Sequence, residues 1–269
     1  MVIDFHTHIF PEKIALKTIR LLEERSGDTA STDGTVNGLL SHMEASGVTL
    51  SVALPVLTKP TQFESVFSFA KSVNETYFNN NSGILSFAGI HPDCEDIDKK
   101  MLEIKKAGFK GVKIHPDYQA KFFDDKGYIQ ILNSANEYDL IVVTHAGVDD
   151  GYKDQPVRCT VPLIKKVLKE VKPKKLVLGH FGAHRLWNDV YNELAGENVF
   201  FDTAVTLHRI DKQLFLDIVK KHGSEKVLFA TDCPWANMSK FLDLFSSFPL
   251  SENEKENILY KNALKLLDL

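Results

Sequence analysis

The chain begins Met1-Val-Ile-Asp-Phe-His-Thr-His-Ile-Phe-Pro-Glu12, and this stretch decides how the rest of the sequence is interpreted. Val2–Phe5 predicts a short buried strand, and His6 and His8 stand at its end. Side chains alternate between the two faces of an extended chain, so these imidazoles point the same way, about 6 to 7 Å apart. Two such imidazoles can bind one metal ion at about 2.0 to 2.1 Å each. The alternative is a pair of half-buried histidines in an ordinary strand.

Eight apolar runs alternate with amphipathic stretches along the chain. The runs are rich in Val, Ile and Leu, as strands buried on both faces must be. No G-x-G-x-x-G motif follows any of them, which counts against a dinucleotide-binding fold. Eight strand-then-helix units favour one α/β domain over residues 1–269, a single (β/α)8 TIM barrel. The predicted strands are Val2–Phe5, Ser51–Val56, Ile84–Ile90, Gly111–Ile114, Leu140–Thr144, Lys175–Leu178, Val199–Phe201 and Lys226–Ala230.

The predicted connections differ in length at the two ends of the strands. Helix-to-strand links are short, as at Gly47–Thr49, Asn80–Gly83 and Lys172–Lys174. Strand-to-helix links are long, and one of them, Ile9 to Thr35, holds a helical piece that forms either a lid or a passive insertion. Long loops on one end of a barrel mark the end that carries function.

Composition excludes several classes of function. A net charge of −4 without a basic block gives no reason to expect a nucleic-acid or membrane partner. The three cysteines are odd in number and widely separated, which favours a reducing compartment and a cytoplasmic location. No apolar run approaches the length of a transmembrane helix. We expect a small-molecule substrate and consider a homodimer possible.

Histidines gather where the predicted strands end. Six of the ten histidines directly follow a strand, and Asp232 occupies the same place after the eighth. In a barrel these strand ends converge on one mouth, so a metal-binding or catalytic cluster is favoured over unrelated polar residues. The six are His6, His8, His91, His115, His145 and His180.

Imidazoles with one carboxylate suit a first-row divalent ion, most simply Zn²⁺, with a position left open for catalysis. Such a metal lowers the pKa of a bound water, and Asp232 could accept that water's proton. We therefore expect a metal-dependent hydrolase whose activity falls as the pH drops through the histidine range, because the ligands must be unprotonated.

These motifs together resemble the amidohydrolase superfamily. They are His6-Thr-His8, His145 after the fifth strand, His180 in Val-Leu-Gly-His-Phe-Gly, and Asp232 in Thr-Asp-Cys-Pro-Trp. The narrower resemblance is to the amidohydrolase 2 branch, which includes aminocarboxymuconate-semialdehyde decarboxylase, resorcylate decarboxylases and pyrone-dicarboxylate lactonase. It covers the whole barrel and implies one metal ion, most simply Zn²⁺, held by His6, His8, His145 and Asp232. It also implies that His180 holds and polarises the metal-bound water, with or without binding the metal.

Other residues keep two interpretations each. Lys113 is either a substrate contact or, as in binuclear relatives, a carbamylated bridge between two metals. Glu12 is an extra ligand or a helix-capping residue. Cys233 is better explained by packing than as a nucleophile, because alternation turns it away from Asp232. The remaining candidates for substrate binding, against structural or surface roles, are His91, His115, Arg158, Arg185 and Trp235.

The resemblance leaves several functions open. The main expectation is the hydrolase, with Asp232 and His180 as catalytic residues. The first alternative is a non-oxidative decarboxylase on the same metal site, whose substrate carboxylate an arginine at the mouth should recognise. A lactonase that works without metal, a TatD-like nuclease and a barrel that only binds a ligand are further alternatives. The last two are disfavoured, the nuclease by Lys113 and the absent basic patch, the binding protein by the complete set of core residues.

Overall fold

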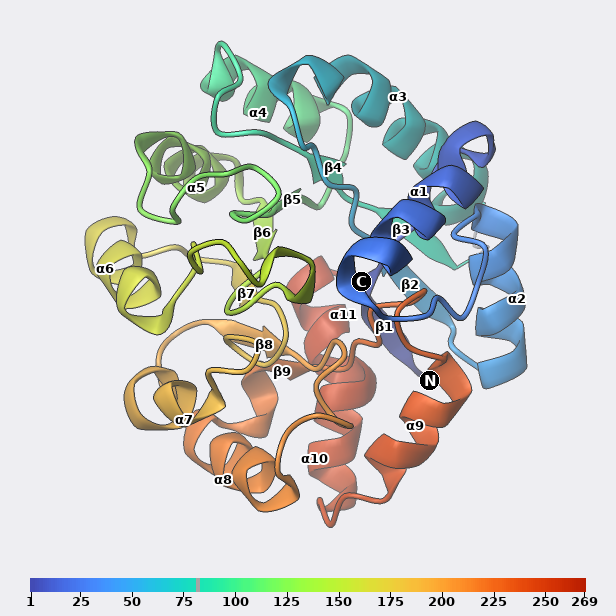
Figure 1. Ribbon diagram of the computed structural model, residues 1–269, viewed down its shortest axis with the longest axis vertical. Coiled ribbons are helices and arrows are strands. Elements are labelled where there is room, and N and C mark those ends of the chain that lie inside the picture. Colours follow the sequence, from blue (N-terminus) through green and yellow to red (C-terminus); the bar gives the residue numbers. More distant parts are fainter. Residues whose placement is uncertain (81–82) are drawn as a thin grey trace.

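In the computed structural model, which describes residues 1–80 and 83–269, nine short parallel strands form a ring with helices around its outside (Figure 1). Each strand lies beside its neighbours in chain order, as β1-β2-β3 and as β4-β5-β6-β7-β8-β9. The strands are β1 Ile3–Thr7, β2 Leu50–Ala53, β3 Ile84–Ser86, β4 Ala88–Gly89, β5 Gly111–Ile114, β6 Ile141–Thr144, β7 Leu176–Leu178, β8 Phe200–Asp202 and β9 Val227–Leu228.

Backbone hydrogen bonds join these two groups of strands into a closed barrel of eight. Only Phe87 separates β3 from β4, so the two are one interrupted barrel strand, predicted from sequence as Ile84–Ile90. On the other side, Phe5 N donates to Phe229 O at 2.9 Å and His8 N donates to Cys233 O at 2.7 Å, which ties β1 to the segment after β9. The predicted TIM barrel is confirmed.

The helices lie outside the strands, and several of their first residues are fixed by local caps. The hydroxyl of Thr35 accepts from Gly38 N, and the carboxylate of Asp211 accepts from Leu214 N. Residues 81–82 of the predicted Asn80–Gly83 link lie outside the described residues. The helices are α1 Glu12–Ser26, α2 Val36–Ser46, α3 Phe63–Val73, α4 Ile97–Lys106, α5 Lys126–Tyr138, α6 Val161–Val171, α7 Trp187–Asp189, α8 Lys212–His222, α9 Met238–Ser246, α10 Glu252–Glu256 and α11 Asn262–Leu267.

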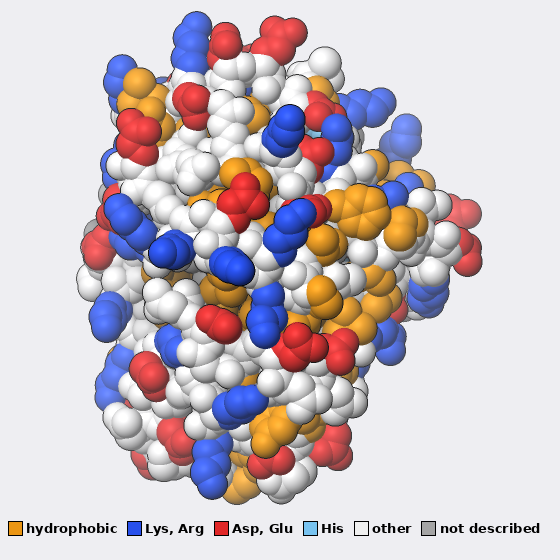
Figure 2. All heavy atoms as spheres, turned by 90° about the vertical axis from the view of Figure 1, so that its left-hand side faces the viewer, with side chains coloured by type: hydrophobic (Ala, Val, Ile, Leu, Met, Phe, Trp, Pro, Cys, Tyr) orange, Lys and Arg blue, Asp and Glu red, His pale blue; other side chains and the backbone are white. Residues whose placement is uncertain are grey.

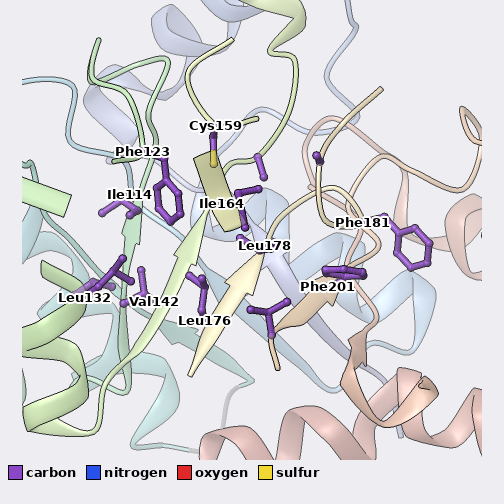
Figure 3. Packing of buried hydrophobic residues seen from close by; sticks show 14 of the residues in the cluster. Ile114, Phe123, Leu132, Val142, Cys159, Ile164, Leu176, Leu178, Phe181 and Phe201 are labelled. Carbon is purple, nitrogen blue, oxygen red and sulfur yellow. The ribbon is translucent and has the colours of Figure 1, made fainter. Parts of the chain in front are cut away.

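Side chains alternate along each strand between the barrel interior and the helices. In β6, Val142 belongs to the outer cluster shared with the helices, whereas Ile141 and Val143 belong to the inner cluster. Figure 3 shows part of the outer cluster, with Val142 and Leu176 on neighbouring strands. The same alternation directs Lys113, between outward-facing Val112 and Ile114, into the barrel.

The two ends of the barrel are covered differently. Helix α11 packs its Ala263, Leu266 and Leu267 into the inner cluster. Helix α1 instead lies over the other end, where Ile14 and Leu21 line a cavity (Figure 1). Figure 2 shows acidic and basic side chains interspersed over one face, and hydrophobic side chains beside the projection at its right edge. Within the described part of the chain, no helix is long and apolar enough to cross a membrane.

Candidate functional site

The ends of the first and last strands bring three predicted ligands together. Nε2 of His8 lies 3.1 Å from Oδ1 of Asp232, and Nε2 of His6 lies 3.5 Å from the same oxygen. One donor atom from each of the three residues lies within 4.8 Å of the others. We call His6, His8 and Asp232 the floor group, because they line the inner end of the cavity in the barrel mouth.

Hydrogen bonds at Nδ1, the ring nitrogen that points away from Asp232 and is called the outer nitrogen here, orient the two histidines of this group. His6 Nδ1 lies 2.8 Å from Asp202 Oδ2, and His8 Nδ1 lies 2.9 Å from the carbonyl oxygen of Leu54. A carboxylate and a carbonyl can only accept, so the proton of each neutral imidazole is assigned to Nδ1. The Nε2 lone pairs therefore face Asp232, which is the arrangement found around metal-ligating histidines.

His180 shares this arrangement. Its Nδ1 lies 3.2 Å from the carbonyl oxygen of Ala204, and its ring centroid lies 5.3 Å from that of His6. The carbonyl assigns the proton of neutral His180 to Nδ1 as well, so Nε2 keeps its lone pair. His180 is thus prepared as a ligand or as a hydrogen-bond acceptor beside the floor group.

The backbone at two of these residues is strained. His180 has φ 59° and Asp232 has φ 69°, in the left-handed region that residues with a Cβ seldom adopt. Such conformations cost about 1 to 3 kcal/mol each and persist only where surrounding contacts enforce them. One such contact is the hydrogen bond from Asp232 N to His6 O, at 2.8 Å. In this backbone conformation the side chains of His180 and Asp232 line the cavity in the barrel mouth.

Burial and charge fix the protonation states of the floor. Burial lowers the pKa of His6 well below its ordinary value and that of His180 to about 4. Burial alone would raise the pKa of Asp232, but the adjacent imidazoles of His6 and His8 outweigh burial and hold that pKa below the usual range. Neutral imidazoles beside a carboxylate anion are the states that metal binding requires.

The donor set fits a divalent metal ion. Oδ1 of Asp232 is buried and has no hydrogen-bond partner among the described residues, although buried oxygens are nearly always satisfied. Lys113 competes with a metal ion at this place, because its Nζ lies 2.9 Å from His6 Nε2, the nitrogen that a metal would need. Burial lowers the pKa of Lys113 to about 8. The described residues therefore include His/Asp groups that could hold a metal.

A second set of residues of the same types lies beside the floor. Donor atoms of His115, His145 and Asp149, which we call the side group, also lie within 4.8 Å of one another. The rings of His115 and His145 stack at 4.3 Å between centroids. His145 is therefore not in the floor group, where the resemblance had placed it, although its ring lies 4.6 Å from that of His180.

The hydrogen bonds of the side group differ from those of the floor. His115 Nδ1 accepts from Tyr118 N at 3.3 Å, so its proton is assigned to Nε2, which faces Asp149 Oδ2 at 3.4 Å. His145 Nε2 is buried and has no hydrogen-bond partner in the described parts of the chain. Burial raises the pKa of Asp149 to about 7. A protonated Nε2 cannot ligate a metal. In the side group His115 is therefore the donor and Asp149 the acceptor, and His145 stacks against His115.

The other candidates separate into those that line the cavity and those that do not. Lys113, His115 and Trp235 line it, together with His145 and His180. His91 instead accepts from Asp93 N in a turn, and Arg185 is half exposed and paired with Asp150. The residues placed away from the cavity lining are His91, Arg158, Arg185, Glu12 and Cys233.

Sequence reasoning missed several residues of this site. Asp202 ends β8 and binds His6, so the strand-end rule that found the histidines also applies to it. Arg25 of α1 and Arg209 line the cavity, which encloses about 760 Å³. Nothing in the local sequence distinguishes these two arginines from the others, because their position depends on how α1 and the loop after β8 pack.

Comparisons with known proteins agree with this architecture. The family model described as amidohydrolase matches residues 3–269, and no curated protein matches the sequence. An uncharacterised TIM-barrel protein from Bordetella bronchiseptica is 15% identical and aligns over 99% of this chain and 98% of its own, with a TM-score of 0.76.

Two decarboxylases are similar in structure at comparable identity. A dihydroxybenzoic acid decarboxylase from Polaromonas, with bound manganese and 2-nitroresorcinol, is 16% identical over 100% of this chain and 97% of its own, with a TM-score of 0.71. The 5-carboxyvanillate decarboxylase from Sphingomonas paucimobilis is 15% identical over 100% and 99%, with a TM-score of 0.69.

These findings correct one expectation and confirm another. The similar structures with a named reaction are mostly decarboxylases, so the hydrolase predicted from sequence is wrong and its decarboxylase alternative is better supported. Manganese occurs in three of them, so zinc has no specific support. The resemblance stated from the sequence is confirmed by the family model over nearly the whole chain. The chain belongs to the amidohydrolase family, within the amidohydrolase 2 branch of that enzyme superfamily.

Proposed function

We propose that this enzyme is a metal-dependent carboxy-lyase that removes CO₂ from a small, planar carboxylic acid. The observation that carries the proposal is the floor group, which places three potential metal ligands in a cavity with largely apolar walls. The Nδ1 atoms of its two histidines are already hydrogen-bonded, which leaves Nε2 for a metal. The reaction named for similar structures supports the same class. Hydroxybenzoic acids are therefore the first substrates to test.

His6, His8 and Asp232 would hold the metal ion, and His180 stands ready as a further ligand or acceptor beside them. A divalent first-row cation here would act as a Lewis acid that binds oxygen atoms of the substrate and orients its carboxylate. Mn²⁺ and Zn²⁺ both suit histidine and carboxylate donors. We propose Mn²⁺ as the first ion to test, since similar structures contain it.

The chain's own groups supply what else the reaction needs. The bond between the ring carbon and the carboxylate carbon breaks, CO₂ leaves, and the same ring carbon gains a proton. Lys113 carries protons next to the floor, with Nζ 2.9 Å from His6 Nε2, and we assign it as the proton donor. Leu54, Phe10 and Phe69 line the cavity and keep water away from the reacting carbon.

The test is CO₂ release from 2,6-dihydroxybenzoate and 5-carboxyvanillate by protein stripped with chelator and reloaded with Mn²⁺ or Zn²⁺. We expect turnover only with metal, and at least hundredfold less in Lys113→Met, which should still bind the metal. Chelator-resistant turnover would contradict the metal's role, and lactone hydrolysis without metal would support the lactonase instead. Lys113→Met with full activity would remove the lysine from the reaction.

Location and assembly remain predictions. We propose a cytoplasmic enzyme, supported by the free, buried state of all three cysteines. Labelling these thiols in intact cells and in denatured extracts tests it, because an oxidising compartment would leave them modified. A homodimer stays an expectation, which sedimentation of the purified protein can check.

A further inference from the structure

Four cations among the described residues line the cavity, namely Arg25, Lys59, Lys113 and Arg209, and they differ in whether an acidic or histidine partner already binds them. Lys59 is solvent-exposed and makes no ion pair in the described ranges. Arg209 is fully engaged: Nη2 binds Asp28 Oδ1 at 2.8 Å, and Nη1 binds Asp150 Oδ2. Lys113 binds His6. Arg25, on the last turn of α1, makes no ion pair with any acidic residue in the described ranges; its Nη1 donates to the hydroxyl of Tyr152 at 2.8 Å. Its charge therefore faces the cavity without a counter-ion.

A row of aromatic rings connects Arg25 with the floor. The Arg25 guanidinium lies 5.0 Å from the Tyr152 ring centroid, and all of the rings that follow belong to residues lining the cavity. Consecutive centroids are 5.3, 4.0, 4.3, 4.6 and 5.3 Å apart along Tyr152, Tyr118, His115, His145, His180 and His6. A flat conjugated molecule would contact these rings along its length.

Apolar side chains make up much of the rest of the lining, with Leu22, Leu54 and Val66 among them. Such walls give a planar molecule few polar contacts between its two ends. The polar groups of the lining lie at the floor with the metal ligands, around Arg25 and Tyr152, and along the segment from Thr58 to Ser65, where Lys59 is exposed. Of these, Arg25 and Tyr152 place a guanidinium and a hydroxyl side by side.

We propose that Arg25 and Tyr152 form a second anion subsite, so that the substrate is a planar acid with another anionic group besides the carboxylate that it loses. The inference rests on the proposed function for the identity of the floor end. A carboxylate would receive two parallel N–H bonds from the guanidinium and a third bond from the Tyr152 hydroxyl, and three donors converging on one anion discriminate it from a neutral group.

An anion bound at Arg25 would also affect the position of helix α1. Arg25 lies on α1, which covers the mouth, and Gly27 ends this helix in the left-handed conformation with φ 80°. An anion bound between Arg25 and Tyr152 would add to the contact that α1 already makes with the turn Asp150–Tyr152. Substrates with the second anion would therefore hold the mouth closed more firmly than substrates without it.

The competing explanation is that Arg25 only packs against Tyr152 and holds α1 in place. The two explanations differ in what Arg25→Gln does to binding. Loss of packing loosens α1 for every ligand, so mono- and dianions lose affinity equally. Loss of an anion subsite weakens dianions alone.

The experiment is calorimetric binding to the full, Mn²⁺-loaded chain at fixed ionic strength. The probes are benzoate and the three benzenedicarboxylates, phthalate, isophthalate and terephthalate, whose carboxylates differ in spacing. We expect at least one dicarboxylate to bind about tenfold more tightly than benzoate. Arg25→Gln should remove that difference and leave benzoate unchanged, and Arg25→Lys should restore part of it, because lysine keeps the charge but not the planar fork.

Arg20→Gln is the matched control, since Arg20 is exposed on the same helix and does not line the cavity. It should bind all four probes as the unmodified chain does. The subsite is overturned if the unmodified chain binds no dicarboxylate more tightly than benzoate. It is also overturned if Arg25→Gln keeps that preference. An equal loss for benzoate and dicarboxylates also overturns it, in favour of packing.

These outcomes are separate from those that test decarboxylation. Binding that depends on Arg25, without CO₂ release from any acid, would preserve the subsite and contradict the carboxy-lyase. CO₂ release from mono- and dicarboxylic acids with equal kcat/KM, unaffected by Arg25→Gln, would preserve the carboxy-lyase and contradict the subsite.

Discussion

The floor group and the side group contain the same residue types and differ in how their outer nitrogens are held. Each has two histidines and one aspartate with donor atoms within 4.8 Å of one another. In the floor group, Asp202 and the Leu54 carbonyl fix both protons on Nδ1, which frees Nε2. In the side group, a bond from Tyr118 N to His115 Nδ1 puts the proton on Nε2. Proximity of ligand types is thus insufficient, because the partner of the far nitrogen decides which lone pair is available.

The largest effect should come from removing a floor ligand. We expect His8→Ala to lose most of its metal after dialysis and more than about 100-fold of its activity, because even partners of ligands are worth 10–100-fold. His115→Ala should keep its metal. Elemental analysis by plasma mass spectrometry measures both. Metal retained in His8→Ala, or lost equally from both variants, would remove the distinction between the two groups.

His145 and His180 sharpen the same comparison. The sequence resemblance implies His145 as a ligand, whereas the hydrogen bond from His180 to Ala204 O prepares His180. We expect His180→Ala to lower metal affinity by at least tenfold and His145→Ala to lower it by less than about threefold. Equilibrium dialysis against Mn²⁺ gives both constants. The reverse order would mean that His145 turns toward the floor when metal binds.

A substitution at Asp202 tests how the orientation of His6 affects metal binding, without replacing a metal ligand. Asp202→Asn keeps the shape but replaces the acceptor on His6 with an amide that can also donate, so we expect metal affinity to fall 10–100-fold. Asp149→Asn makes the same change in the side group and should alter the affinity less than about twofold. Circular dichroism melts of both variants would show whether the loss reflects the fold instead.

The pH dependence of metal binding should also separate buried from ordinary histidines. The sequence predicts loss of ligands as the pH falls through the histidine range, but burial holds the pKa of His6 well below its usual value and that of His180 to about 4. Both imidazoles therefore stay unprotonated well below an ordinary histidine pKa of about 6.5. We expect neither His6 nor His180 to take up a proton between about pH 7.5 and 5.5, so that protons compete with the metal for these two imidazoles only towards pH 4. NMR titration of the ring protons measures this, and a midpoint near pH 6.5 for His6 or His180 would contradict this account.

The repeating pattern made the barrel predictable, while boundaries depended on long-range pairing. Gly111–Ile114 was predicted with the bounds that β5 has, because a glycine and a proline flank its apolar run. Ile84–Ile90 is interrupted at Phe87, where the chain leaves one neighbouring strand and joins the next. A single-sequence pattern contains no signal for that change of partner.

The site was predictable as far as it depends on strand ends. That rule placed His6, His8 and Asp232 together, and it would have found Asp202 had carboxylates been sought as well as imidazoles. It could not rank His145 against His180, because the proton of His180 is positioned by the carbonyl oxygen of Ala204, whereas His145 Nε2 has no hydrogen-bond partner among the described residues. Neither fact can be predicted from the strand ends. Arg25 lies beyond it altogether, since only the packing of α1 brings it to the mouth.

His222 extends the comparison to a histidine with both nitrogens satisfied. Gly196 N donates to its Nδ1 at 3.1 Å, and Nε2 lies 3.0 Å from Val199 O, so no lone pair remains for a ligand. Burial lowers its pKa to about 3, against about 6.5 in the unfolded chain. Below pH 6.5 the unfolded chain therefore takes up a proton that the folded chain refuses, and stability falls with falling pH.

Between pH 7 and pH 5 this histidine alone should lower the free energy of unfolding by about 2 kcal/mol. Urea denaturation at both pH values measures the change in the unmodified chain and in His222→Gln. The variant is less stable at pH 7, because it loses the ring stacked 3.8 Å from Phe201, but it should lose less on acidification. An identical pH dependence in both chains would mean that His222 is protonated in the fold, and that satisfied hydrogen bonds at both nitrogens do not keep a buried imidazole neutral here.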